Sequence, residues 1–210
     1  MRLNSRPTLL SLSLCLLPLA ANAYGQEVPK DVLKHIRAVS VSIEWEGRTR
    51  ASGVIFHKEG ETYCLTANHV VDAAGDRQIR VVQHSTGKVV SINAEIHRQD
   101  EEHDYAILKL GKGVFTEGAK VCCKKPGLDT PVVHCGSMRG FDHTVTRGYI
   151  NGLDRELGHG QRDQVDLTAD MGRSGGGVFT TQGELIGIVT QGHPQRLVFF
   201  VPVRRMEGLK

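Results

Sequence analysis

The sequence has few features of membrane or nucleic-acid-binding proteins. Beyond its N-terminal segment, no apolar run approaches the ~20 residues that a membrane-spanning helix needs. Lysine and arginine are scattered without a long run or stripe, and there is no low-complexity tract or short-period repeat. The composition therefore argues against a second membrane segment and against a nucleic-acid partner.

The N-terminal segment 1–23 has the pattern of a secretory signal. Its parts are a basic start (Arg2, Arg6), a short apolar core (Leu9–Leu17) and a small-x-small cleavage motif (Ala21-Asn22-Ala23). A membrane anchor is the alternative, but the apolar run is short and Pro18 interrupts its end. Leu14 before Cys15 argues against a lipoprotein signal. We expect cleavage near Ala23, no membrane anchor afterwards, and a periplasmic or secreted protein.

Most of the net positive charge belongs to this signal. The whole chain has a formal net charge of +3, and removal of Arg2 and Arg6 leaves 24 basic and 23 acidic residues, a net charge of +1. The remaining chain of about 185 residues suits one compact domain, or two small barrels packed as one unit.

Of the five cysteines, four remain after signal removal: Cys64, Cys122, Cys123 and Cys135. An oxidising compartment permits disulfides, and four cysteines allow three full pairings. Cys64 lies in an apolar run and is predicted to be a small buried hydrophobe. A bridge from Cys122 or Cys123 to Cys135 stays open. A zinc site with His134 or His143 is a weaker alternative, because adjacent cysteines lack the usual ligand spacing.

The pattern along the mature chain is one of short strands and glycine turns after one N-terminal helix, expected at 28–37. Strands are expected at 39–45, 53–56, 63–66, 79–82, 88–92, 93–96, 105–110, 131–135, 144–150, 164–167, 177–179, 185–190 and 197–203. This texture indicates an all-β sandwich or a pair of barrels. We expect a first barrel over 24–113, a linker over 114–130 carrying Pro126-Gly127, and a second barrel over 131–210.

A glycine-rich stretch, Asp170-Met171-Gly172-Arg173-Ser174-Gly175-Gly176-Gly177, stands between two of these strands. A serine flanked by glycines can sit on a tight turn with its hydroxyl exposed and with backbone N–H groups directed at one spot. Such a turn suits a nucleophile and an oxyanion hole. The alternative is a glycine turn whose serine is merely solvated.

Two further stretches supply a base and a carboxylate. His69 follows the apolar run Leu65–Ala67, and an imidazole there can act as a general base. Asp104 directly precedes the apolar strand 105–110, where a partly buried carboxylate can accept from the imidazole Nδ1–H. By itself, a histidine in such a setting is more often an ordinary residue of a turn or core than a catalytic base. Glu101 and Glu102 are interpreted as solvated acids of a charged loop.

Together the three stretches follow the His, Asp, Ser order of chymotrypsin-like serine proteases. The chain most closely resembles the HtrA/Deg protease domain over roughly residues 39–203. The shared motifs are Ser52-Gly53-Val54-Ile55, Thr66-Ala67-x-His69-Val70, Asp104-Tyr105-Ala106-Ile107-Leu108, Thr144-Val145-Thr146-x-Gly148, Gly172-x-Ser174-Gly175-Gly176 and Gly183-Glu184-Leu185-Ile186-Gly187-Ile188.

The resemblance implies two six-stranded antiparallel β-barrels with the active site in the cleft between them. Ser174 would be the nucleophile, His69 the base and Asp104 the group that steadies the imidazolium. Backbone N–H groups of Gly172, Arg173 and Ser174 would form the oxyanion hole. No cofactor is implied, and no acidic loop supports calcium. The expected partners are polypeptide substrates, and the sequence does not indicate an oligomeric state.

The chain departs from these relatives in three respects. Arg173 stands where chymotrypsin relatives have an acid that binds the new N-terminus after zymogen cleavage, so that route of activation is not expected. The sequence ends at Lys210, so the PDZ modules typical of HtrA proteins are not expected. Thr168 replaces the acid of a trypsin specificity pocket, to which Gly192, Val198 and Phe200 are also assigned. This uncharged, partly filled pocket predicts small or aliphatic P1 side chains.

Two other functions remain compatible with the sequence. A catalytically silent trypsin-like domain could bind extended polypeptide as a chaperone or adhesion module. The same constellation could also hydrolyse a non-peptide ester.

Overall fold

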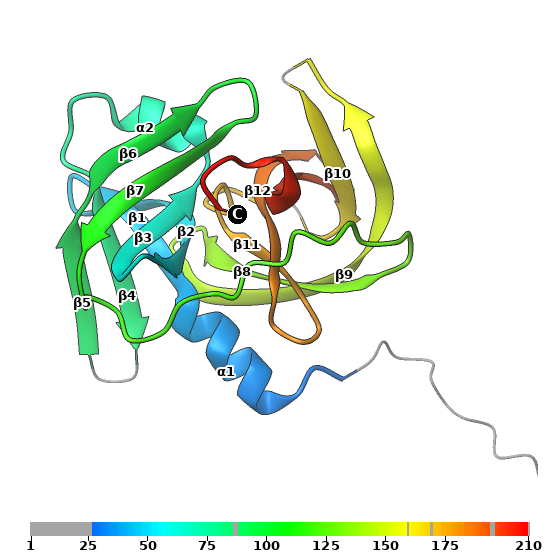
Figure 1. Ribbon diagram of the computed structural model, residues 1–210, viewed down its shortest axis with the longest axis horizontal. Helices are drawn as coiled ribbons and strands as arrows, with labels where there is room; N and C mark the ends of the chain where they lie inside the picture. The colour runs from blue at the N-terminus through cyan, green and yellow to red at the C-terminus, as the bar shows by residue number, and fades with distance from the viewer. Residues whose placement is uncertain (1–26, 86–87, 159, 169, 194–195, 210) are drawn as a thin grey trace, which may run out of the picture.

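The structure is a computed structural model that describes residues 27–85, 88–158, 160–168, 170–193 and 196–209. The secretory signal expected over residues 1–23 lies outside these ranges. No helix within them is long and apolar enough to cross a membrane. In Figure 1 two strand-rich halves lie side by side, with a helix beneath them.

The first half is an antiparallel sheet of seven strands in the order β5-β4-β1-β2-β3-β7-β6. Its strands are β1 (Ser40–Trp45), β2 (Arg48–Lys58), β3 (Glu61–Thr66), β4 (Arg80–Ser85), β5 (Lys88–Asn93), β6 (Glu95–Asp100) and β7 (Tyr105–Gly111). Glu59 and Gly60 both have positive φ in the tight turn between β2 and β3, which suits the twist of a two-residue hairpin. A short helix, α2 (Asn68–Ala74), follows β3.

The sheet has the seven strands that the sequence pattern predicts between residues 39 and 110, one more than the six that the family resemblance implies, and its hydrogen-bonded order is open. β5 and β6 are separated at Ala94, where the extended segment bends. The Ala94 N–H donates to the Ile79 carbonyl at 2.9 Å, between the end of β5 and the start of β6. β5 pairs with β4 and β6 pairs with β7, so a single bent segment joins the two edges of the curled sheet.

The second half is a closed six-stranded antiparallel barrel in the order β10-β13-β12-β11-β8-β9. Its strands are β8 (Pro131–Met138), β9 (Phe141–Glu156), β10 (Gln161–Asp166), β11 (Gly177–Thr180), β12 (Leu185–His193) and β13 (Leu197–Pro202). The predicted all-β, two-barrel architecture is therefore confirmed, with a closed second barrel and a curled first half.

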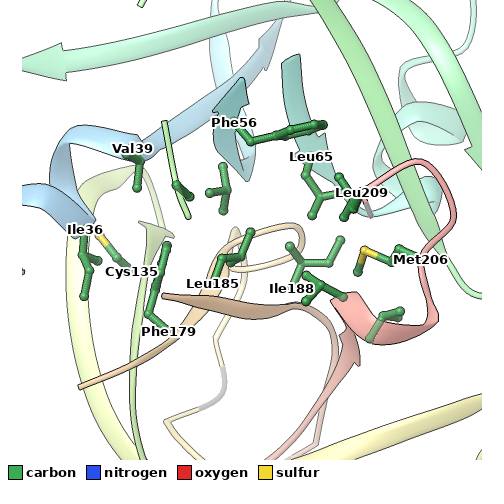
Figure 2. Packing of buried hydrophobic residues seen from close by; sticks show 14 of the residues in the cluster. Ile36, Val39, Phe56, Leu65, Cys135, Phe179, Leu185, Ile188, Met206 and Leu209 are labelled. Atoms are coloured by element: carbon green, nitrogen blue, oxygen red, sulfur yellow. The ribbon is translucent and has the colours of Figure 1, made fainter. Parts of the chain in front are cut away.

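Three apolar clusters stabilise this arrangement. One fills the first half, one fills the second barrel, and the third lies between the halves. Figure 2 shows the third cluster, to which the first half contributes Phe56 and Leu65, and the second half Phe179 and Ile188. Burial of such side chains removes apolar area from water at roughly 25 cal/mol per Å². The shared cluster fixes how the two halves face each other.

The helix α1 (Lys30–Val39) also packs against the third cluster through Ile36 and Val39. The carbonyl of Ile36 accepts a hydrogen bond from Ser40 Oγ at 2.7 Å where the helix gives way to β1. The helix covers most of the range predicted for it from the sequence.

Two segments connect the halves outside the sheets. Residues 112–130 contain no helix or strand apart from an isolated bridge between Val121 and Leu185, and the limits of the predicted linker stay a prediction. The segment 203–209 returns to the first half, where the Glu207 N–H donates to Tyr105 Oη at 3.0 Å. Met206 and Leu209 enter the shared cluster (Figure 2).

Candidate active site

His69 is the second residue of α2, directly after the buried strand β3. The first turn of this helix is tied to its surroundings through Asn68. Asn68 Nδ2 donates to Asp72 Oδ2 at 2.7 Å, and Gln99 Nε2 of β6 donates to Asn68 Oδ1 at 3.0 Å. The His69 side chain is 45% exposed, so the helix presents its imidazole to solvent.

The structure brings Asp104 into contact with His69. His69 Nδ1 lies 2.9 Å from Asp104 Oδ2, and the His69 backbone N–H donates to Oδ1 at 2.9 Å. Asp104 has a φ of 52° in the turn before β7, a conformation that aspartate adopts more readily than most residues. A carboxylate only accepts hydrogen bonds, so the proton of the neutral ring is on Nδ1. His69 Nε2 is therefore left as an acceptor.

Ser174 lies on a tight loop that ends at β11. Gly172 and Gly175 on either side have φ values of 89° and 80°, a backbone conformation that favours glycine. A Cβ on Gly175 would stand 2.2 Å from Ser52 O and 3.1 Å from Ala67 N. The Ser174 loop thus packs closely against the chain that leads into His69.

Carbonyl groups of this loop are hydrogen-bonded, whereas three of its successive N–H groups are not. Met171 O accepts from Arg139 N at 3.0 Å, and Arg173 O accepts from Gly176 N at 2.8 Å. In the described part of the chain, the N–H groups of Gly172, Arg173 and Ser174 have no hydrogen-bond partner. Because N–H and C=O of one peptide point in opposite directions, the loop leaves free donors near the Ser174 side chain.

The Ser174 hydroxyl also lacks a hydrogen bond to any described residue, as does His69 Nε2. Hydrogen bonds between a nucleophile and its base are often long without a substrate and tighten when one binds. The open geometry is therefore compatible with a nucleophile and base that meet around a substrate.

Ser52 of β2 joins this loop to the first half. Its backbone N–H donates to Ser174 O at 2.9 Å and its Oγ donates to Gly172 O at 2.7 Å. Ser52 Oγ also accepts from Ser137 N of β8 at 2.7 Å. Ser52 is fully buried, so these bonds are sheltered from water.

Arg173 points into the protein beneath the loop and is only 2% exposed. Its Nη2 donates to Thr146 Oγ1 at 3.1 Å, whereas Nε and Nη1 have no partner among the described residues. Burial lowers the Arg173 pKa to about 10, although the Asp170 carboxylate opposes this shift. Arg173 is therefore a buried cation directly before Ser174 in the loop.

His134 is buried beside this cation. Its Nδ1 lies 3.0 Å from Gly177 O, which only accepts, so Nδ1 carries the proton. Burial, and then the charge of Arg173, hold the pKa of His134 well below its usual range. The ring is therefore neutral near pH 7.

The far side of the loop is tied to the turn between β8 and β9. Arg139 Nε donates to both carboxylate oxygens of Asp170, at 2.8 and 2.7 Å. This hydrogen bond and the Arg139 charge lower the Asp170 pKa, together with the Met171 N–H.

A cleft of about 600 Å³ opens beside His69 and Asp104. It runs from α2 and the turn before β7 to the hairpin between β9 and β10 and to β12. The second half contributes Leu157, Gly158, Arg162, Thr190 and Gln191. The cleft therefore lies between the two halves, next to the histidine.

The residues assigned to the specificity pocket are placed apart from this cleft. Val198 and Phe200 lie in the core of the second barrel, 1% and 0% exposed, because alternate residues of β13 face the barrel interior. Thr168 and Gly192 are exposed. None of the four lines the cleft. The preference for small or aliphatic P1 residues stays a prediction.

All four cysteines outside the predicted signal are free thiols, so the structure forms neither of the bridges considered for Cys135. Cys64 is buried as expected, and burial raises the pKa of its thiol far above the usual range. Within the described ranges, no group of His, Cys, Asp or Glu is placed to hold a metal ion. The weaker zinc hypothesis thus has no structural support there.

Sequence reasoning missed several residues of this region. Ser52 was noted only as part of a motif, and its two contacts with the Ser174 loop depend on the packing of the two halves. Arg162 and Thr190 are remote in the sequence from His69, and no local pattern distinguishes them. Glu101 was interpreted as a solvated loop acid, yet it lines the cleft.

Comparisons with known proteins agree with this architecture. The family model described as the trypsin-like peptidase domain matches residues 51–188. A "Probable periplasmic serine endoprotease DegP-like" of Pseudomonas fluorescens is 32% identical over 155 residues, which cover 70% of this chain and 30% of the relative. A relative with the same name from Ectopseudomonas mendocina is 34% identical over 152 residues, with the same coverage. The chain thus spans about a third of the length of these relatives.

Solved structures give the same result. A serine endoprotease from Yersinia pestis has a TM-score of 0.70 and 28% identity, over 84% of this chain and 64% of that chain. The crystal structure of Deg5 has a TM-score of 0.68 over 82% of this chain and 87% of that chain. At 23% identity, Deg5 supports the fold alone.

Proposed function

The chain belongs to the trypsin-like peptidase family, and from this membership we propose that it is a serine endopeptidase that uses Ser174, His69 and Asp104. One observation carries the proposal. Asp104 accepts both the Nδ1–H and the backbone N–H of His69, which leaves Nε2 free as a base, while Ser174 sits on a loop with unpartnered N–H groups.

In the first step, Ser174 Oγ attacks the carbonyl carbon of a peptide bond as His69 Nε2 takes the hydroxyl proton. Asp104 stabilises the resulting imidazolium through its hydrogen bond to Nδ1–H. The oxyanion of the tetrahedral intermediate accepts from the free N–H groups of Gly172 and Ser174. Each such donor is worth about 3 kcal/mol of transition-state stabilisation.

In the second step, the imidazolium passes its proton to the departing amine, and an ester forms between Ser174 and the acyl part of the substrate. His69 then takes a proton from water, which attacks this ester and releases the second product. The cycle returns Ser174 and His69 to their starting protonation states, so no cofactor is required.

We also propose that the substrates are exported or misfolded proteins in the periplasm. The periplasmic location is part of the names of the relatives, and the chain begins with the pattern of a secretory signal. Neither feature identifies an individual substrate.

Labelling with a fluorophosphonate, followed by casein cleavage, tests the enzymatic proposal. The wild-type protein is expected to be labelled at Ser174 and to degrade casein, and Ser174→Ala is expected to lose both properties. Casein cleavage that survives in Ser174→Ala would refute the assignment. Casein binding without labelling would favour a silent polypeptide-binding domain, and labelling with ester but not peptide hydrolysis would favour an esterase.

A further inference from the structure

The charged side chains that line the cleft beside His69 differ in their exposure to solvent. Asp72 and Glu101 are exposed on the wall formed by the first half. Arg162, from the opposite wall, is the one lysine or arginine among the described residues that line the cleft, and it is only 4% exposed. The surface that a ligand meets in this cleft is therefore negatively charged.

The two exposed carboxylates have no cationic partner in the described part of the chain. Asp72 accepts hydrogen bonds only from neutral amides, Asn68 Nδ2 at 2.7 Å and Gln99 Nε2 at 3.1 Å. Glu101 makes no hydrogen bond or ion pair with any described residue. Both carboxylates are free to pair with a cationic group of a ligand.

Arg162 does not offset them at the surface. Its Nη1 donates to the Gln161 carbonyl at 3.2 Å. Burial lowers the pKa of Arg162, while the carboxylates of Asp104 and Asp100 act in the opposite direction. Its charge thus interacts with Asp104, which also lines the cleft, and with Asp100, rather than with Asp72 or Glu101.

A second, independent observation also points to a ligand. Thr190 of β12 lines the cleft and is 8% exposed, yet its Oγ1 has no hydrogen-bond partner among the described residues. Buried hydroxyls in folded proteins are normally hydrogen-bonded. An N–H group of a ligand in the cleft would supply the missing partner.

We infer that this cleft takes a lysine or arginine side chain of the polypeptide substrate, at a residue near the scissile bond but not the one whose carbonyl Ser174 attacks. The inference rests on the proposed function. The ammonium or guanidinium group pairs with Glu101 and Asp72, and the methylene stem lies along Leu157. We place this basic residue beside the attacked residue, rather than at it, because the cleft is lined by His69 but not by Ser174.

The substrate preference of this cleft is separate from that of the P1 pocket. A P1 preference for small or aliphatic residues and a need for a basic residue nearby can hold together, since they concern different sites. Substrates would be basic segments of unfolded chains rather than any extended polypeptide.

Quenched fluorescent peptides test the preference. One peptide framework is varied one position at a time around the scissile bond, with lysine, norleucine or glutamate at that position. Norleucine keeps an apolar stem without the charge. At one position other than P1, we expect kcat/KM to be about five- to tenfold higher with lysine than with norleucine, and the ratio to fall as salt is added.

The variants Glu101→Gln and Asp72→Asn are expected to reduce this ratio singly, and together to bring it close to one. Glu102→Gln is the matched control, because Glu102 is an exposed neighbour of the same charge that does not line the cleft. It is expected to leave the ratio unchanged. Urea midpoints establish that each variant is folded.

Binding to the Ser174→Ala protein separates this inference from the proposed function. Lysine peptides are expected to bind more tightly than norleucine peptides in fluorescence anisotropy, whether or not the wild-type protein cleaves them. Equal binding of the two, tighter binding of glutamate peptides, or a ratio that persists in the double variant would overturn the inference. Failure of fluorophosphonate labelling would instead count against the proposed function alone.

Discussion

Ser52 Oγ donates a hydrogen bond to the carbonyl oxygen of Gly172 at 2.7 Å, so a residue of the first half holds the loop that carries Ser174. The same residue binds Ser174 O through its backbone N–H at 2.9 Å. Gly172 O shares its peptide group with the Arg173 N–H, so the Ser52 Oγ bond turns that N–H to the opposite side of the loop, while the bond to Ser174 O holds the end of the loop in place. The orientation of the proposed oxyanion hole therefore depends on the contact between the halves.

Replacement of Ser52 by alanine is expected to weaken catalysis more than its cost in stability suggests. The buried Gly172 carbonyl and the Ser137 N–H both lose a partner, and the free energy of unfolding should fall by about 1–3 kcal/mol. Loosening of the loop should lower kcat by up to about 10²-fold.

Ser40→Ala is the matched control for this change. Ser40 is buried and its Oγ donates to Ile36 O at 2.7 Å, away from the loop. A similar loss of stability with unchanged kcat is expected for Ser40→Ala. Equal kcat values for Ser52→Ala and the wild-type protein would contradict a role of Ser52 in positioning the loop.

The Asp104→Asn variant is expected to remain folded but to lose about 10⁴-fold in kcat. The asparagine amide can donate to Nδ1, which favours the tautomer with its proton on Nε2 and removes the base. Peptide hydrolysis against pH measures this effect. Asp100→Asn is the control, because Asp100 accepts from His103 rather than His69. A comparable loss in both variants would show that general damage to the turn explains the result.

The sequence suffices to propose the candidate triad, because three motifs that are ambiguous one by one together follow the His, Asp, Ser order of chymotrypsin-like serine proteases. Ser174 has flanking glycines, His69 follows a buried strand, and Asp104 precedes one. Their approach to one another is a property of the tertiary fold. The hydrogen bond between His69 Nδ1 and Asp104 forms only because the turn before β7 lies against α2. No local sequence pattern predicts this contact.

The sequence pattern predicts separate strands at 88–92 and 93–96, as β5 and β6 are, but not the bend at Ala94, which is stabilised by a hydrogen bond to Ile79 O from a distant turn. The orientation of the side chains of β13 was also not predictable from the sequence. A strand that is buried on both faces shows no alternation, so the face of Val198 and Phe200 that meets the barrel core was not readable from the sequence.

Gly175→Ala is expected to destabilise the protein by more than about 3 kcal/mol, because two costs combine. The φ of 80° strains any residue with a Cβ, and that Cβ would stand 2.2 Å from Ser52 O and from Thr66 Oγ1. Gly140→Ala isolates the first cost, since Gly140 has a φ of 82° with nothing within 4 Å. Urea unfolding of the two variants should therefore differ by at least the cost of the clash. Equal destabilisation would show that the loop relaxes around the added methyl group.

His134 is expected to make stability fall as the pH drops below about 6.5, the ordinary pKa of an unfolded histidine. Burial and Arg173 lower its pKa in the folded state. Between the two pKa values the unfolded chain binds a proton that the folded chain does not, so stability is lost by up to about 1.4 kcal/mol per pH unit. The loss is complete only below the folded-state pKa.

Urea unfolding of the wild-type protein and of His134→Asn between about pH 7 and pH 5 measures this effect. Asparagine keeps an N–H donor for Gly177 O but does not titrate. His143, whose pKa is also lowered mainly by burial, adds a slope of the same sign to both proteins. The variant should therefore show a shallower slope. Identical slopes would mean that His134 is not the titrating group.

The return of the segment 203–209 to the first half sets an order of assembly. Met206 and Leu209 complete the cluster between the halves, and Glu207 reaches Tyr105 of the first half. In the export that the N-terminal pattern predicts, the chain would emerge from its N-terminus, with His69 and Asp104 outside long before residues 203–209. A partly translocated chain, even with Ser174 exposed, lacks the contacts that seat one half against the other. We therefore expect the proposed peptidase activity to begin only once residue 209 has emerged.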